Sequence, residues 1–388
     1  MFSFEYHIPT RIVFGEGSVK RAGEIASEYG KRVMLVSYDE DLIKNIGFYD
    51  KAMQPLLAAG LEVIPLFGVK SNPDVTLVRK GIQLCKENNV DLVIGLGGGS
   101  AMDTAKGVAV GACYDGDVWD FPIGQAVIKD ALPIMTIVTI PATSSEMNPT
   151  SVLNNDEVRR KDGFVSPFMY PTVSILDPEL TYSLPWKQTA ISAADIVSHL
   201  MEGYINHTVD WAPMQDHYAQ GMIKTIMECT DRLQKDLGDK EARAMFMWTA
   251  TNAWNGFYVC GLGAYDQIIH IVGHSFSAFY DTPHGSAMSV SIPAVMKYHR
   301  DERLEKYSVF ANEVFGIEGD VSSETAQKGI DALEAWFKKI GVPVNFTEAN
   351  MPTDELDAMA DDILETAHRW GTTRYTKEMI LDLLKFAI

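Results

Sequence analysis

The stretch DLVIGLGGGSAMDTAKG (residues 91–107) passes from an apolar run through three glycines into a segment of helical composition. Its apolar beginning predicts a buried strand, and the residues from Ser100 onward predict a helix. Gly97, Gly98 and Gly99 carry no Cβ, so a phosphate can approach the backbone and the N-terminus of that helix. Strand, glycine turn and helix in this order indicate an α/β fold with a place for a nucleotide, although glycines also form plain turns after strands.

This glycine turn differs from two common phosphate-binding patterns. It is not G-x-G-x-x-G, and it follows the fourth apparent strand rather than the first, so an ordinary Rossmann arrangement is not predicted. A Walker loop is excluded, since no Gly-Lys-Ser or Gly-Lys-Thr follows the glycines. Ser100 either caps the helix or donates to a phosphate oxygen.

Outward from this stretch, the first half of the chain alternates apolar runs with helix-like segments. The predicted strands are residues 11–14, 32–36, 62–67, 91–95, 134–140 and 173–176, and the predicted helices are residues 18–30, 49–60, 73–88 and 100–112. Such alternation predicts a mostly parallel sheet covered on both faces. After Asp177 the spacing of apolar residues is helical throughout. We therefore expect an α/β dinucleotide-binding domain in residues 1–184 and an all-helical domain in residues 185–388.

Metal-ligating side chains gather in two short stretches of the second half, DIVSH and HIVGHSFSAFYDTPHG. Asp195 and His199 are four residues apart, as are His270 and His274, and His284 follows ten residues later. Four residues is about one helical turn, so each pair projects from one helix face. A single Asp–His pair is more simply a surface ion pair. Three imidazoles and a carboxylate in apolar surroundings, however, are costly to bury without a partner, so the combination predicts a divalent metal.

Two further loops follow predicted strands and carry polar side chains. TIPATSSEMN (139–148) offers Thr139, Thr143 and Ser144 as hydroxyl donors, either to a ligand or to a helix end. Asp39 lies just past the second strand, where a carboxylate often accepts hydrogen bonds from the ribose of a nucleotide. As an isolated feature it is only a loop acid.

Composition and charge exclude several classes of partner. A hydrophobic content of 46% with 22% charged residues is typical of a globular protein. The net charge of −19 disfavours nucleic acid and anionic lipid. No run approaches the roughly 18 apolar residues of a membrane span, and the N-terminus lacks the order of a secretory signal. The four cysteines are far apart. We expect a cytoplasmic protein with reduced thiols and neither a nucleic-acid nor a membrane partner.

Together these features resemble the iron-containing (group III) alcohol dehydrogenases, over nearly the whole chain. The resemblance is carried by PTRIVFGEGS (9–18), GGGSAMDTAK (97–106), TIPATSSEMN, DPEL (177–180), DIVSH and HIVGHSFSAFYDTPHG. Within the family, the chain is most similar to the butanol-dehydrogenase-like branch. The resemblance implies the fold shared with dehydroquinate synthases, in which an α/β nucleotide-binding domain precedes an all-α, metal-binding domain.

The resemblance also implies the metal site and the reaction. Asp195, His199, His270 and His284 are the implied ligands, and such a set suits Fe²⁺, Zn²⁺ or another borderline divalent ion. His274 falls beside the metal, as a proton relay or as a packing residue. The implied activity is hydride transfer between a nicotinamide cofactor and a short-chain, butanol-like alcohol or aldehyde. The alternatives are a glycerol- or diol-type dehydrogenase of the same superfamily, or a metallohydrolase using the same ligands.

The expected cofactor site combines the loops above with positions implied by the resemblance. Its residues are Asp39, Gly97, Gly98, Gly99, Ser100, Asp103, Thr139, Thr143, Ser144, Lys161 and Leu180. For Lys161, the neighbouring Arg160 is an equal candidate, and a solvated surface lysine is the plain alternative. The resemblance further implies a homodimer.

Cofactor preference depends on the loop after the second strand. In relatives that favour NADPH this loop resembles Gly-Gly-Gly-Ser followed shortly by Lys, whereas this chain has Asp39, Glu40, Asp41 and Leu42. Carboxylates here repel the additional phosphate of NADPH, and Asp39 can accept from the ribose hydroxyls of NADH. We therefore expect NAD(H) to be preferred over NADP(H).

Overall fold

The computed structural model describes all 388 residues, which form two compact units. The α/β unit comprises His7–Pro185 and Asp236–Asn255, and the helical unit comprises Met1–Tyr6, Trp186–Lys235 and Gly256–Ile388. The chain thus leaves the α/β unit after Pro185 and returns to it for one helix. A division into domains 1–184 and 185–388 stays a prediction.

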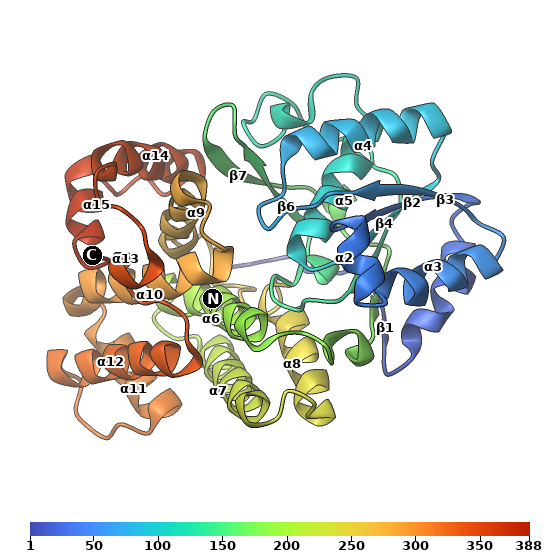
Figure 1. Cartoon of the computed structure of the whole chain (residues 1–388). Coiled ribbons are helices and arrows are strands. Elements are labelled where there is room, and N and C mark those ends of the chain that lie inside the picture. The colour runs from blue at the N-terminus through green and yellow to red at the C-terminus, as the bar shows by residue number, and fades with distance from the viewer. The chain divides into compact units, whose positions relative to one another are not determined.

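Six parallel strands form the sheet of the α/β unit, as predicted. Their order is β1-β8-β5-β4-β2-β3 (Figure 1). The strands are β1 (Arg11–Phe14), β2 (Arg32–Ser37), β3 (Glu62–Phe67), β4 (Leu92–Gly97), β5 (Ile134–Val138) and β8 (Val173–Leu176). The connecting helices are α1 (Ala22–Ala26), α2 (Glu40–Asn45), α3 (Phe48–Ala58), α4 (Val75–Asn88) and α5 (Gly99–Ala112). Strands β2 and β4 are neighbours, yet β2 leads to β3 on one side and β4 leads to β5 on the other.

Helices cover both faces of this sheet, which explains why its strands are apolar without alternation. Met34 and Val36 of β2 point into a core formed with α4 and α5. Val33 and Leu35, the alternate residues of the same strand, point into a second core formed with α1 and α3. Figure 1 shows α3 and α4 on opposite sides of β2 and β3.

A two-stranded antiparallel hairpin accompanies the sheet and was not predicted. It consists of β6 (Thr150–Asn155) and β7 (Arg160–Val165). Polar residues dominate both strands, so period-two alternation of hydrophobicity is weak. Leu153 is fully buried in the core of α4 and α5, and the backbone N–H of Asn154 donates to the Pro73 carbonyl. These contacts fix the hairpin beside the sheet.

Helix α8 (Lys240–Ala253) belongs to the α/β unit although it lies late in the sequence. The buried Arg243 donates to the carbonyls of Leu184 and Leu237. Farther along α8, the Thr251 hydroxyl donates to the buried carboxyl of Glu146. Tertiary hydrogen bonds of this kind leave no local pattern in the sequence.

The helical unit is built around α6 (Trp186–Asn206), which is buried over nearly its whole length. The other helices are α7 (Pro213–Lys235), α9 (Ile268–Tyr280), α10 (His284–His299), α11 (Leu304–Phe315), α12 (Ser323–Ile340), α13 (Phe346–Ala349), α14 (Leu356–Arg369) and α15 (Lys377–Leu384). Glycines allow close helix packing, since a Cβ on Gly285 would collide with the Ile191 carbonyl and one on Gly273 with Met288. These contacts bring α6, α9 and α10 together.

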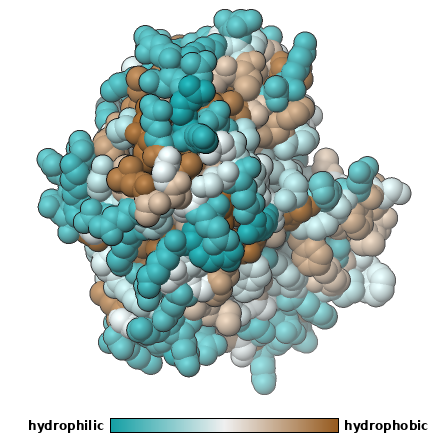
Figure 2. Space-filling model, turned by 90° about the vertical axis from the view of Figure 1, so that its right-hand side faces the viewer, coloured by the Kyte–Doolittle hydropathy of each residue, from teal (hydrophilic) through white to brown (hydrophobic).

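Two observations describe the hydrophobic character of the helices and of the surface. No helix combines the length and the apolar character that a membrane crossing needs. On the face shown in Figure 2, hydrophobic residues form separate areas among hydrophilic ones. Scattered hydrophobic residues on a surface are ordinary.

Candidate functional site

One face of α6 carries a line of buried polar residues. Asp195, His199, Glu202 and Asn206 are spaced by four, three and four residues, which keeps them on the same side of the helix. All four are buried. Such a concentration of polar groups is costly unless each has partners, so this face identifies the site.

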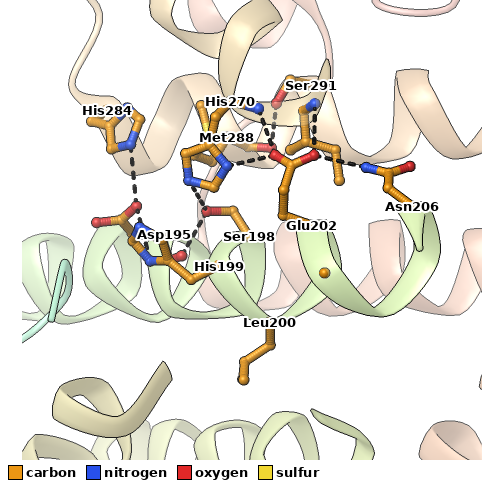
Figure 3. Close-up of polar contacts among 12 residues, drawn as sticks. Asp195, Ser198, His199, Leu200, Glu202, Asn206, His270, His284, Met288 and Ser291 are labelled. Atoms are coloured by element: carbon orange, nitrogen blue, oxygen red, sulfur yellow. Dashed lines mark hydrogen bonds and ion pairs between the residues drawn. The ribbon is translucent and has the colours of Figure 1, made fainter. Parts of the chain in front are cut away.

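The expected metal ligands converge beside this face (Figure 3). Ligand atoms of Asp195, His199 and His270 all lie within 4.8 Å of one another. His284, the first residue of α10, places Nε2 3.4 Å from Oδ1 of Asp195. Three helices therefore bring together one carboxylate and three imidazoles. This donor set fits a borderline divalent cation.

The protonation state of His199 is also suited to metal binding. Burial lowers the pKa of His199 well below its usual value, and the adjacent His270 adds to the shift. A neutral imidazole has a lone pair to donate, whereas a protonated one has none. His199 is thus in the form that can bind a metal.

His274 lies on the edge of the cluster. Its ring is 5.3 Å from that of His284 and 6.3 Å from that of His270, measured between centroids. The ring of Trp370 packs edge-on against it at 5.5 Å. His274 is buried beside the four convergent residues, in a place that suits either a relay or a packing role.

Glu202 is a site residue that the sequence reasoning missed. Its carboxylate is fully buried and lies 2.6 Å from Nδ1 of His270 (Figure 3). Burial raises the pKa of Glu202, while hydrogen bonds from the backbone of α9 and from Asn206 oppose that shift. A signal was present, because Glu202 is seven residues after Asp195 and three after His199 on the same helix face.

Tyr258 is a second missed residue. Its hydroxyl donates to the His199 carbonyl at 2.6 Å and accepts from the Gly203 N–H at 3.2 Å. The hydroxyl is therefore inserted between two groups that normally bond to each other in a helix. A Cβ on Gly203 would lie 2.6 Å from this oxygen, so glycine is needed here. Tyr258 fixes the turn of α6 that carries His199.

The candidate cofactor site lies at the carboxyl ends of β2 and β4 in the α/β unit. Because β2 and β4 connect in opposite directions, their ends form the crevice where open parallel sheets bind ligands. Tyr38 directly follows the last residue of β2, and its hydroxyl accepts from the Gly98 N–H at 2.8 Å. Burial raises the pKa of Tyr38 to about 12, so the hydroxyl keeps its proton.

The N-terminus of α5 differs from those of neighbouring helices. Asp39 caps α2 and Asp74 caps α4 through side-chain oxygens, whereas the N-cap of α5 is Gly98, which has no side chain to offer. A helix N-terminus without a side-chain cap is suited to an anion such as a phosphate. A Cβ on Gly99 would collide with the side chain of Thr143, so the turn needs glycine there.

Several of the predicted hydroxyl residues make internal hydrogen bonds. Ser144, at φ 54°, donates to the Ala250 carbonyl and accepts from the Trp254 N–H. Ser100 donates to the Ser71 carbonyl. The hydroxyl oxygen of Thr143 accepts from the Ser145 N–H at 3.2 Å, and Thr139 is buried with its N–H bonded to the Gly97 carbonyl. In this structure the Ser144 hydroxyl therefore holds its loop in place through hydrogen bonds within the protein.

Three other predicted residues are buried in the same unit. Asp103 accepts from the Ser145 hydroxyl and the Val152 N–H, and Lys161 of β7 donates to the Asn72 side chain at 3.1 Å. Lys161 is thus not a solvated surface lysine. Leu180 lies in the core formed with α1 and α3.

Lys106 is a further buried cation near this site and was not predicted. Its ammonium donates to the carbonyls of Asn148 and Thr150 and to the Asn148 side chain. Burial lowers its pKa to about 8. Lys106 ties α5 to the loop that carries Thr143, and its place one turn after Asp103 was the available signal.

Comparison with known proteins agrees with this geometry. The chain matches the family described as "Iron-containing alcohol dehydrogenase" over residues 9–178, and "Fe-containing alcohol dehydrogenase family, C-terminal" over residues 189–388. The chain belongs to the iron-containing alcohol dehydrogenase family. This confirms the family and the fold inferred from the sequence.

Three of the similar proteins within the family are named as butanol dehydrogenases. The chain is 37% identical to "Probable NADH-dependent butanol dehydrogenase 1" of Bacillus subtilis, over 100% of both chains. It is 38% identical to "NADH-dependent butanol dehydrogenase A" of Clostridium acetobutylicum, covering 93% of this chain and 92% of the relative. A crystal structure of NADH-dependent butanol dehydrogenase A from Thermotoga maritima matches with a TM-score of 0.95 at 37% identity, covering 100% of this chain and 99% of the other.

These findings establish the class of reaction. This member of the iron-containing family is a metal-dependent alcohol dehydrogenase or aldehyde reductase that uses a nicotinamide cofactor. The comparisons do not favour the glycerol-type or metallohydrolase alternatives.

Proposed function

We propose that the enzyme interconverts short-chain aliphatic alcohols and aldehydes, with one Fe²⁺ held by Asp195, His199, His270 and His284. The observation that carries this proposal is the convergence of buried ligand atoms within 4.8 Å. The names of the butanol dehydrogenases that share full-length similarity support the substrate class. The family description supports iron, although the same four donors also suit Zn²⁺.

The protein's own residues would hold and orient the reactants. A divalent cation supplies Lewis acidity to the substrate oxygen, and the nicotinamide supplies or accepts the hydride. His199 stays a neutral imidazole because burial disfavours the imidazolium form, and Asp195 is the one carboxylate among the proposed ligands. The cluster's burial also excludes water, which protects the reacting groups from competing hydrolysis and proton exchange.

His274 is the candidate for moving a proton at the substrate oxygen. Support comes from its burial, with its ring 5.3 Å from the ring of His284 between centroids. If it is a relay, His274→Ala keeps its metal but loses turnover and changes the pH profile. Loss of metal together with activity would instead make His274 a ligand or a support for one.

The α/β unit would hold the cofactor at the ends of β2 and β4. We assign the phosphates to Gly97, Gly98, Gly99 and the N-terminus of α5, with the glycines allowing close approach. The other predicted contacts are Ser100, Asp103, Thr139, Thr143, Ser144, Lys161 and Leu180. Of these, Ser100 is partly exposed, whereas Ser144 and Leu180 are buried and offer backbone groups rather than side chains.

We infer that NAD(H) is preferred over NADP(H). Support comes from the hydrogen bond between the Gly98 N–H and the Tyr38 hydroxyl, because Asp39 is the residue that follows Tyr38. Asp39 caps α2, and Glu40 pairs with Lys44 at 2.6 Å, so the basic residue of this loop is already neutralised. The remaining acids repel a 2′-phosphate, and the butanol dehydrogenases similar to this chain are named for NADH.

We also propose a cytoplasmic homodimer. All four cysteines are thiols, which persist in reducing compartments. The N-terminal residues lie outside every helix and strand, and Phe2 and Phe4 are largely exposed. Met1 contacts Gln215, which follows Trp211 by four residues, and Trp211 is 80% exposed. A second copy of the chain would cover this apolar surface.

Sedimentation of the wild-type protein should give a dimer, and Trp211→Ser should shift the equilibrium toward monomer. A wild-type monomer would contradict the proposal.

The function is tested by following NADH oxidation. Anaerobically purified protein with Fe²⁺, butyraldehyde and NADH should lose absorbance at about 340 nm, the band of reduced nicotinamide. Treatment with a chelator should abolish the reaction, and Fe²⁺ should restore it. Equal rates in chelated and reconstituted protein would contradict metal dependence, and absence of reaction with every short aldehyde would contradict the substrate class.

A further inference from the structure

The N-terminus of α9 is capped by a side chain from another helix. Its own N-cap residue, Gln267, makes no side-chain capping bond. Instead, the backbone N–H groups of Ile269 and His270 donate to the Glu202 carboxylate at 3.2 and 2.8 Å. These are the second and third residues of the helix, whose N–H groups have no partner within it. A carboxylate there also interacts favourably with the helix dipole.

The same carboxylate holds the side chain of His270. Oε2 of Glu202 lies 2.6 Å from Nδ1 of His270, and the Asn206 amide donates to Oε1 at 2.7 Å. Figure 3 shows Glu202 between Asn206 and the His270 ring, with Asp195 and His199 on the other side of that ring. Glu202 therefore links α6, which carries two expected ligands, to α9, which carries a third.

The chemistry of these contacts determines which nitrogen of His270 carries the proton. Two backbone N–H groups and the Asn206 amide can only donate, so the carboxylate accepts from all three. An ionised carboxylate can only accept, so the fourth neighbour, Nδ1 of His270, bonds to it as a donor. A proton on Nδ1 leaves the lone pair on Nε2, the nitrogen that faces Ser198 and the cluster at 3.5 Å from the Ser198 hydroxyl.

We propose that Glu202 is a positioning residue of the metal centre, which caps α9 and keeps the proton of His270 on Nδ1, so that Nε2 is the ligand. The proposal rests on the proposed metal site. It differs from a purely structural role, in which Glu202 would only hold α6 and α9 together and either nitrogen of His270 could carry the proton. Carboxylates behind metal-bound histidines raise ligand basicity and fix ring orientation.

The helical unit contains a comparable pair outside the cluster. Glu302 lies 2.9 Å from Nδ1 of the buried His299, whose Nε2 is 2.9 Å from the Tyr375 hydroxyl. Glu302→Gln changes the same chemical group against the same type of ring. It is therefore the control for Glu202→Gln. In Glu202→Gln, one of the two acceptor oxygens becomes an NH₂ group that faces other donors.

Nitrogen-15 NMR of histidine-labelled, metal-free protein at mildly alkaline pH shows directly which ring nitrogen of His270 carries the proton. In wild type, His270 should carry its proton on Nδ1. Glu202→Gln should shift His270 toward the Nε2-protonated form, whereas Glu302→Gln should leave it unchanged. His270→Ala assigns the resonance by its absence.

Titration with Co²⁺, followed by its visible absorption, gives the second readout. Glu202→Gln should weaken Co²⁺ binding by about 10–100-fold, as loss of a partner behind a ligand does elsewhere. Glu302→Gln should bind like wild type. Equal weakening in both variants would assign the effect to general destabilisation and overturn the proposal.

The outcomes separate this inference from the proposed function. Wild type that binds no Co²⁺ would reject the metal site itself. Wild type that binds Co²⁺ but carries the His270 proton on Nε2 when metal-free would reject only the role of Glu202, as would wild-type affinity in Glu202→Gln. Should Glu202→Gln fail to fold, the wild-type spectrum alone decides.

Discussion

The two units place their functional groups by opposite means. In the α/β unit the candidate site is shaped by missing side chains, because Gly98 gives α5 no side-chain cap and Gly99 lets Thr143 pack closely against the turn. In the helical unit it is shaped by side chains crowded on one face of α6, with Glu202 and Tyr258 holding them in place. The comparison teaches that a phosphate site needs space at a backbone, whereas a metal site needs side chains fixed in direction.

The largest expected effect is loss of a metal ligand. His284→Ala should lower kcat/KM by well over the roughly 10–100-fold typical of a supporting residue, because the donor set becomes incomplete. NADH affinity, measured by fluorescence titration, should stay within about twofold, since the variant leaves the α/β unit intact. His299→Ala, which removes a buried histidine of the same unit outside the cluster, is the control. A large fall in NADH affinity would show that the two sites are not built independently.

The second prediction concerns the tightly packed glycine turn of the α/β unit. Gly99→Ala places a methyl group against Thr143, and overpacking of this kind should weaken NADH binding by about tenfold. Metal content should not change. Thr143→Ala in the same chain should restore part of the affinity, and Gly221→Ala, where a Cβ meets no atom within 4 Å, should have no effect. Unchanged NADH affinity in Gly99→Ala would place the cofactor elsewhere.

The third prediction concerns charge beside the same turn. Asp39→Asn removes a charge but keeps an oxygen to cap α2. The ratio of kcat/KM for NADPH to that for NADH should rise by about tenfold, allowing for solvent screening of an exposed acid. Asp239→Asn makes the same change at the N-cap of α8 and should leave the ratio unaltered. A wild type that prefers NADPH would refute the assignment.

The fourth prediction has the smallest expected effect and concerns Tyr258 in the helical unit. Tyr258→Phe removes the hydroxyl between the His199 carbonyl and the Gly203 N–H, and leaving these buried groups unbonded should cost about 1–3 kcal/mol of unfolding free energy. Co²⁺ affinity should fall a few-fold as His199 loses its support. Tyr204→Phe, whose buried hydroxyl bonds to Gln220, should cost stability without changing Co²⁺ affinity. Equal Co²⁺ binding in both variants would reduce Tyr258 to a packing residue.

Features that rest on local sequence patterns could be predicted, whereas features that rest on tertiary contacts could not. The six strands and the clustered metal-ligating residues were predictable, since buried strands are apolar runs and ligands four residues apart share a helix face. Glu202 has the right spacing on α6, but its partner on α9 is brought to it only by tertiary packing. The hydroxyl of Ser144 was ambiguous for a related reason, because its partners Ala250 and Trp254 lie more than a hundred residues away. The hairpin of β6 and β7 was missed because its residues are mostly polar.

The metal content of His270→Ala, measured by elemental analysis beside wild type after anaerobic purification, tests the central claim most directly. His270 is the proposed ligand that links α9 to the face of α6, through both the cluster and Glu202. We predict one divalent metal ion per chain in wild type and almost none in the variant, with NADH binding retained. Stoichiometric metal in folded His270→Ala protein would contradict the account.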